Sequence, residues 1–142
     1  MNDRVFLDTN ILIYAHDTNA GSKHSVASKL VSRIWEDGNG AVSTQVLQEF
    51  YVNVTRKLRE PLSRTKAREL VTLYAQWFLQ EIGLRELESA MAIEQKCKVS
   101  FWDALILAAA QSARASSLIS EDLNNGQVVG GVRVTNPFVR QK

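Results

Sequence analysis

Four acidic residues occupy positions where metal-dependent chemistry is expected, at the ends of short apolar runs or in the early turns of helical segments. They are Asp8, Glu49, Asp103 and Asp122. In an open parallel sheet, sites form beyond the carboxyl ends of the strands, so acids near different strand ends converge at one edge. Packed carboxylates repel one another, and a divalent cation relieves that repulsion. Because all the donors are oxygens, the set favours Mg²⁺, or Mn²⁺ in its place, which can activate water against a phosphodiester bond.

Each acid also has a purely structural interpretation. Asp8 can cap the turn that follows it, and Glu49 can be a solvated helix residue. Asp103 stands three residues after a serine, which is close to the spacing of a capping box. Asp122 belongs to a turn-rich segment, and its neighbour Glu121 competes with it as the fourth acid. Placement alone leaves these alternatives open.

Short apolar runs alternate with segments of helical spacing along the chain. The runs predict strands at residues 5–7, 41–43, 78–82, 117–119 and 132–134. Helical spacing, with its start and stop signals, predicts helices at residues 11–15, 23–37, 45–57, 64–76, 84–96 and 101–114. This alternation predicts an α/β fold in which helices cover both faces of a mainly parallel sheet of about five strands.

The length of 142 residues suits one domain over the whole chain, 1–142. No apolar run approaches the ~20 residues that span a bilayer, so no membrane partner is expected. The N-terminal segment lacks a signal-peptide pattern and Cys97 is the lone cysteine, so we expect a cytoplasmic protein. Lys and Arg number 17 against 15 Asp and Glu. If a metal neutralises the four acids, 17 cations face 11 remaining acids, and this basic exterior of net +6 suits a polyanion.

The segments that carry the four acids resemble the motifs of one family. They are residues 5–14 (VFLDTNILIY), 43–50 (STQVLQEF), 100–104 (SFWDA) and 120–123 (SEDL). In this order and spacing they resemble the PIN-domain ribonucleases, specifically the VapC-type toxins of bacterial toxin–antitoxin pairs, over nearly the whole chain. The resemblance implies a three-layer α/β/α PIN-like fold, Mg²⁺-dependent cleavage of RNA and a cognate antitoxin protein as partner. Whether the protein forms a homodimer is left open.

The resemblance also assigns residues. The family's four acids fall on Asp8, Glu49, Asp103 and Asp122, as catalytic residues and metal ligands. Thr9 and Asn10 match the polar positions that support the first acid. The fourth acid is assigned to Asp122 rather than Glu121, because the family pattern places it two residues after a Ser or Thr, here Ser120.

Other polar and aromatic residues have less specific interpretations. A basic run that includes Arg64, Lys66 and Arg68 either contacts RNA phosphates or forms a solvated helix end. We expect His16 and His24 to be surface residues rather than metal ligands. The tryptophans at positions 35, 77 and 102 are expected in the core or in a partner groove, with stacking on RNA bases as the weaker alternative.

Rival functions fit the sequence less well. A phosphatase of the haloacid-dehalogenase type needs a second aspartate two residues after the first, where this chain has Asn10. A receiver domain needs a phosphoacceptor aspartate after its third strand and a lysine near its fifth, and neither is evident. A DNA-directed metal nuclease and a catalytically idle PIN module that only binds RNA remain as alternatives.

Overall fold

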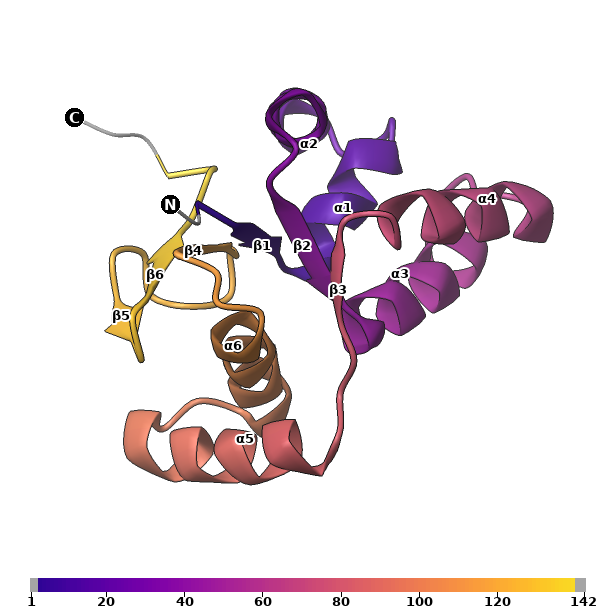
Figure 1. Ribbon diagram of the computed structural model, residues 1–142. Helices are drawn as coiled ribbons and strands as arrows, with labels where there is room; N and C mark the ends of the chain where they lie inside the picture. Colours follow the sequence, from indigo (N-terminus) through magenta and orange to yellow (C-terminus); the bar gives the residue numbers. More distant parts are fainter. Residues whose placement is uncertain (1–2, 140–142) are drawn as a thin grey trace.

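The computed structural model describes residues 3–139, which form a six-stranded sheet covered by helices (Figure 1). The strands are β1 (Val5–Leu7), β2 (Gly40–Ser43), β3 (Phe78–Gln80), β4 (Ser117–Ile119), β5 (Val128–Val129) and β6 (Val132–Thr135). Their order across the sheet is β3-β2-β1-β4-β6-β5. All neighbouring pairs are parallel except β5 and β6, which pair antiparallel. The first strand of the chain therefore lies inside the sheet, between β2 and β4.

Helices form the two outer layers. Those of the described residues are α1 (Thr9–His16), α2 (Ser22–Asp37), α3 (Thr44–Arg56), α4 (Arg64–Tyr74), α5 (Leu84–Cys97) and α6 (Phe101–Ser112). Figure 1 shows α1 and α2 on one side of the sheet and α5 and α6 on the other. α3 packs against both α1 and α4. This is the three-layer α/β/α arrangement that the sequence predicted.

The core is built around α6, which is apolar on every side. Residues 104–110 are all buried, because α6 contacts several strands on one side and α5 on the other. A helix that is hydrophobic all round is expected in such a position. β1 and β2 contribute further buried side chains, among them Phe6, Leu7 and Val42. Although α6 is strongly apolar, no helix within residues 3–139 has the length and hydropathy needed to cross a membrane.

Serine caps fix where two site-bearing helices begin. The Oγ atoms of Ser43 and Ser100 accept hydrogen bonds from the backbone N–H groups of Val46 and Asp103, at 3.2 and 3.1 Å. These are N-cap bonds, which satisfy donors that the first turn of a helix leaves without partners. They position the starts of α3 and α6 beside the sheet, and so fix the acids that these helices carry.

The predicted elements are confirmed, with ends shifted by about two residues or less. β3 is shorter than predicted because it ends at Gln80, and two residues later the Ile82 N–H donates to a side chain, Thr44 Oγ1, at 3.2 Å. α1 begins at Thr9, earlier than predicted, because Asp8 caps it. The sequence analysis missed β5, a two-residue strand that turns back into β6. Two residues are too few to show the alternation of apolar and polar side chains that identifies a strand. The turn after β5 depends on Gly130 and Gly131, which adopt φ angles of 54° and 85°.

Candidate active site

The four predicted acids lie together at the carboxyl edge of the sheet. Asp8 follows β1, Glu49 lies in α3, Asp103 lies in the first turn of α6, and Asp122 lies in the loop after β4. They line a single cavity of about 180 Å³. The other lining residues are Thr9, Asn10, Gln45, Asn53, Trp102 and Ile106. The predicted convergence of the acids is therefore present in the fold.

Asp8 is the most buried of these acids, with a relative exposure of 6%. The backbone N–H of Thr9 donates to Asp8 Oδ1 at 2.7 Å, and Ser120 Oγ donates to Oδ2 at 2.8 Å. Burial raises the pKa of Asp8 from 3.8 to about 6, although these hydrogen bonds act in the opposite direction. The negative charges of Asp122 and Asp103 add to the increase. Asp8 is thus the N-cap of α1, and burial and the negative charges of neighbouring acids disfavour the ionised form of its carboxyl group.

Glu49 is half-buried and is linked to the first motif by a side-chain contact. Thr9 Oγ1 donates to Glu49 Oε1 at 2.7 Å. This contact contradicts the interpretation of Glu49 as a merely solvated helix residue. Gln45, Glu49 and Asn53 follow one another at intervals of four residues in α3 and all line the cavity. That spacing, which places them on one helix face, was the signal by which Gln45 and Asn53 could have been found from the sequence.

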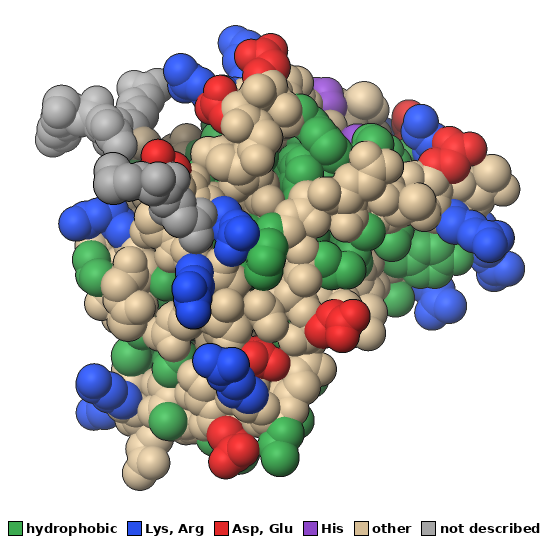
Figure 2. Space-filling view, viewed as in Figure 1, with side chains coloured by type: hydrophobic (Ala, Val, Ile, Leu, Met, Phe, Trp, Pro, Cys, Tyr) green, Lys and Arg blue, Asp and Glu red, His purple; other side chains and the backbone are tan. Residues whose placement is uncertain are grey.

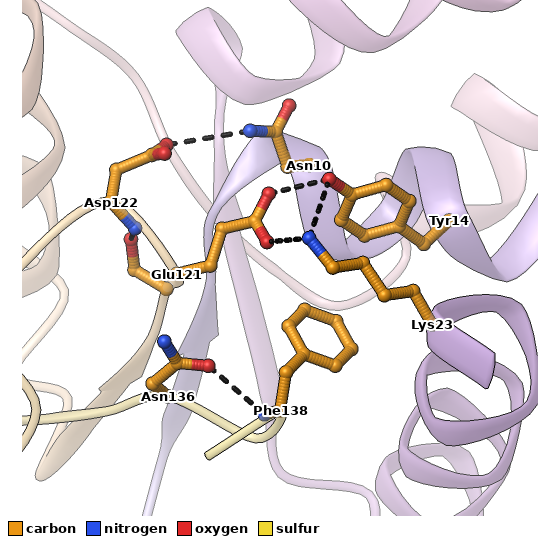
Figure 3. A network of polar contacts seen from close by, with 8 residues as sticks. Asn10, Tyr14, Lys23, Glu121, Asp122, Asn136 and Phe138 are labelled. Carbon is orange, nitrogen blue, oxygen red and sulfur yellow. Dashed lines mark hydrogen bonds and ion pairs between the residues drawn. The ribbon is translucent and has the colours of Figure 1, made fainter. Parts of the chain in front are cut away.

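Glu121 is directed away from the cavity by two partners on α1 and α2 (Figure 3). Tyr14 Oη donates to Glu121 Oε1 at 2.5 Å, and Lys23 Nζ lies 2.7 Å from Oε2. Burial opposes the ionisation of Glu121, but the hydrogen bonds from Lys23, Tyr14 and Asn10 together with the charge of Lys23 outweigh it and lower the pKa of Glu121. The sequence analysis did not anticipate Tyr14 and Lys23, because nothing in the local pattern pairs them with a residue about a hundred positions later.

Asp122 is the acid of this pair that lines the cavity. Asn10 Nδ2 lies 3.4 Å from Asp122 Oδ2, and the Asp122 backbone N–H donates to Ser120 Oγ at 3.2 Å. Partial burial and the charges of Asp103 and Glu121 raise the pKa of Asp122. The geometry therefore agrees with the choice of Asp122 over Glu121.

Asp103 has only half of the capping-box pattern. Its backbone N–H donates to Ser100 Oγ at 3.1 Å. Within residues 3–139, the reciprocal bond of a capping box, from the Ser100 backbone N–H to the Asp103 carboxylate, is not present. The carboxylate instead lines the cavity, and its charge raises the pKa values of Asp8 and Asp122. Ser100 thus supplies the cap, while the Asp103 side chain faces the other acids.

The donors of the cavity suit a hard cation that keeps much of its water. Within residues 3–139, no three Asp, Glu, His or Cys side chains are grouped tightly enough to enclose a metal ion. Mg²⁺ does not need such an enclosure, because it commonly binds one or two carboxylates and retains several waters. The lining offers carboxylate, amide and hydroxyl oxygens and no imidazole or thiol, so its chemistry fits Mg²⁺ or Mn²⁺ and not zinc.

The basic residues singled out in the sequence lie outside this cavity. Arg64, Lys66 and Arg68 are exposed on α4, and Figure 2 shows Lys and Arg side chains at the end of the molecule where α3 and α4 lie. Arg68 borders a separate, mainly apolar groove between these two helices. None of the three cations lines the acidic cavity. Their contact with RNA stays a prediction.

The two histidines are less exposed than expected, since both are only partly accessible, but neither lines the acidic cavity. His16 packs edge-on against Phe50 and Tyr74, with its Nε2 atom 2.6 Å from Tyr74 Oη. Burial lowers the pKa of His16 to about 4. His24 is half-buried, with its Nδ1 atom 2.8 Å from the carbonyl oxygen of Tyr14. Both imidazoles help to hold α1 in place, and neither lines the acidic cavity.

Comparisons with known proteins agree with this geometry. The sequence matches the PIN domain family over residues 5–128. Similar solved structures include a toxin–antitoxin complex from Klebsiella pneumoniae (TM-score 0.70, 23% identity, 94% of this chain and 98% of that chain covered). They also include VapBC2 from Rickettsia felis, bound to a promoter DNA fragment (TM-score 0.64, 14% identity, 93% of this chain and 97% of that chain covered). A third is VapC20 from Mycobacterium tuberculosis, described as a sarcin-ricin loop cleaving toxin (TM-score 0.58, 16% identity, 80% of this chain and 86% of that chain covered). No curated protein sequence matches significantly.

Proposed function

Because the chain belongs to the PIN domain family, we propose that it is a cytoplasmic, metal-dependent endoribonuclease that hydrolyses phosphodiester bonds in RNA. The observation that carries this proposal is the cavity where four acids from distant segments meet. The charged residues that line this cavity are all acidic and would repel a phosphodiester, so the lining suits a divalent cation that attracts both the carboxylates and the phosphate.

The first acid is the best prepared to bind a cation. Thr9 and Ser120 hold the two carboxylate oxygens of Asp8, and each oxygen has acceptor capacity left for another partner. The contacts from Asn10 to Asp122 and from Thr9 to Glu49 orient two further carboxylates. Carboxylates that are oriented in advance lose less freedom when the ion arrives.

The cation and the side chains around it would have separate roles in the hydrolysis. Asp8, Glu49, Asp103 and Asp122 would hold the Mg²⁺ or Mn²⁺ ion, which would supply a water of lowered pKa and offset charge on the phosphate. Glu49 has one oxygen committed to Thr9, and its Oε2 atom is the acceptor we assign to the proton of the attacking water. Asp103 and Asp122 add negative charge that favours a cation over a second anion in the cavity.

RNA is the preferred substrate because the proposal follows the PIN-domain ribonucleases that the motifs resemble. Charge supports a polyanionic substrate in general, since cations outnumber acids once the four cavity acids are set aside. It does not distinguish RNA from DNA. A DNA-directed nuclease and an idle RNA-binding module are therefore the alternatives that the cleavage assay has to decide between.

We extend the proposal to a toxin held inactive by a cognate antitoxin protein. The support is the fold, because one similar solved structure is described as a toxin–antitoxin complex and another as a toxin. The acidic cavity is small and open at the surface, so a partner segment that carries a cation could neutralise it and exclude the substrate. Induced expression should arrest growth, and co-expression with the protein encoded by the adjacent gene should restore it. Equal growth of cells that express wild type or Asp8→Asn at equal abundance would argue against a toxin.

A cleavage assay tests the nuclease proposal directly. Purified wild-type protein should cut RNA in Mg²⁺ or Mn²⁺ and stop in excess EDTA, while Asp8→Asn should be inactive although folded. Matched single-stranded RNA and DNA of one sequence separate the two nuclease classes. Binding of RNA without any metal-dependent cleavage would leave only the idle module, and undiminished cleavage in EDTA would exclude the metal mechanism.

A further inference from the structure

The rim of the acidic cavity carries an exposed aromatic side chain that the proposed reaction does not use. Trp102 lines the cavity, yet it is 62% exposed. Tryptophan gains much from burial, so a surface position next to an acid such as Asp103 is not explained by stability. Its ring forms a T-shaped pair with Phe101 at 5.3 Å, and most of its surface remains open to a ligand.

The other two tryptophans behave as core residues. Trp35 and Trp77 lie 4.9 Å apart between ring centroids, and both pack against Tyr74. They lie shortly before β2 and β3 begin, at the amino ends of the strands. The acidic cavity is at the opposite, carboxyl edge. Trp102 is therefore the tryptophan that is both exposed and close to the acids.

Gln45 lines the same cavity and carries a hydrogen-bond acceptor that has no partner and is closed to solvent, so a rotation of its side-chain amide would present this acceptor to a ligand. It is 6% exposed and lines the cavity, and its Oε1 atom has no hydrogen-bond partner. Its Nε2 atom reaches the backbone carbonyl of Trp102 only at 3.5 Å. In the described part of the chain, Asn39 and Trp77 also have a buried polar atom without a partner, but neither lines this cavity. An unsatisfied acceptor in such a place is costly, and a bound ligand is one way to satisfy it.

Resting on the nuclease activity proposed above, we infer that Trp102 and Gln45 form a nucleoside subsite beside the four acids. The indole face of Trp102 stacks on the base next to the phosphate that is cut. The Gln45 amide accepts a hydrogen bond from a hydroxyl or amino group of the same nucleotide. Stacking on an aromatic ring is available to every base, so Trp102 would position the strand without fixing its sequence.

The volume of the cavity favours an arrangement in which the phosphate lies inside it and the base lies at its rim. At about 180 Å³ it is smaller than the roughly 300–1,000 Å³ of sites that enclose a small-molecule ligand. It has room for a phosphate group and a hydrated cation, so the attached base has to lie at the rim. Trp102 is the one aromatic residue among those that line the cavity.

Binding measurements on uncleaved RNA test the subsite. We would place Asp8→Asn in every protein to prevent cleavage and titrate a single-stranded RNA of about ten nucleotides. Adding Trp102→Ala should weaken binding about tenfold while the dependence of affinity on salt stays the same, because stacking releases no counterions. Trp102→Phe should retain most of the affinity but lose the quenching of tryptophan fluorescence by RNA. Met91→Ala, an exposed apolar residue of α5 outside the cavity, is the matched control and should change neither.

Gln45→Met tests the second half of the subsite, since it removes the amide and keeps a side chain of similar length. Its affinity for RNA should fall several-fold. If a ribose hydroxyl is the donor, DNA of the same sequence should bind this variant and its parent equally, whereas an amino donor from the base predicts a loss with both. Unchanged affinity in a variant whose melting temperature is preserved overturns the role of Gln45.

The outcomes separate this inference from the function on which it rests. If the Asp8→Asn parent does not bind RNA and wild type does not cleave it, the proposed function fails. If cleavage and binding are intact but Trp102→Ala binds RNA as tightly as its parent, only the subsite fails. Weakened binding of a protein partner together with unchanged RNA affinity would show that Trp102 is a protein contact, and would likewise overturn the subsite.

Discussion

The hydroxyl of Ser120 donates a hydrogen bond to Asp8 Oδ2 at 2.8 Å, although the two residues are 112 positions apart in the chain. Ser120 is fully buried and also accepts a hydrogen bond from the backbone N–H of Asp122. One serine therefore connects the carboxylate at the end of β1 with the loop that follows β4. The acids of the cavity are held in relation to each other by neutral donors, and this arrangement leads to the following predictions.

Replacing Asp8 with asparagine should stabilise the metal-free protein at neutral pH. The folded state raises the pKa of Asp8 to about 6, so between pH 4 and 6 it binds more protons than the unfolded chain, and its stability falls as pH rises through this range. The variant should gain about 1–2 kcal/mol at pH 7, less than the full shift implies because the amide replaces one acceptor oxygen by a donor. The gain should vanish near pH 4.

Thermal melts of wild type and Asp8→Asn in EDTA, from pH 4 to pH 8, measure this difference. The variant should also lose the stabilisation that Mn²⁺ gives to wild type, because a ligand stabilises only the state that binds it. A variant that is destabilised by the same amount at every pH would show that the folded state does not raise the pKa of Asp8.

Asp103 and Ser100 should have opposite effects, because the first supplies a carboxylate and the second supplies the helix cap. Asp103→Asn should leave the stability of the metal-free protein unchanged or raised, and should abolish cleavage. Ser100→Ala should cost about 1 kcal/mol and retain cleavage. Melts with and without Mn²⁺, together with one cleavage assay, compare them. The assignment of Asp103 would be wrong if its variant were less stable yet fully active.

The neighbouring acids Glu121 and Asp122 should differ in the same assay. Asp122→Asn should reduce cleavage and Mn²⁺ affinity by about 100-fold or more, on the scale of metal-site substitutions. Glu121→Gln should change both only a few-fold, because Lys23 and Tyr14 hold Glu121 away from the cavity. Comparable losses in the two variants would mean that Glu121 reaches the metal.

The basic residues of α4 can be tested through salt dependence. If Arg64, Lys66 and Arg68 contact phosphates, changing all three to alanine should weaken RNA binding and reduce the slope of log affinity against log salt by about 2. Affinity for one RNA measured from low to high salt gives the slope. An unchanged slope would assign these cations to a solvated helix end.

Local patterns were enough to predict most of the fold and the meeting of the four acids at one edge of the sheet. Asp8 and Asp103 stand at a strand end and a helix start, where short-range rules apply, so their placement could be argued from adjacent residues. The orientation of Glu121 depends on Lys23, and the burial of His16 depends on Tyr74. Such long-range partners are set by packing between elements, which the spacing of one segment does not encode. Gln45 could be predicted only in part. Its spacing from Glu49 places both residues on one helix face, but the lack of a hydrogen-bond partner for its Oε1 atom depends on packing.

The position of β1 inside the sheet has a consequence for how the protein comes into being on the ribosome. β1 precedes the other five strands in the chain, yet its neighbour β4, and the Ser120 hydroxyl that bonds Asp8 just after β1, lie 112 positions later. A nascent chain that has released its first three strands still lacks Ser120 and Asp122, so it cannot assemble the cavity. Under the proposed nuclease function, the cavity is completed only after residues 120–122 have been synthesised, so a shorter nascent chain is expected to leave the surrounding RNA uncut.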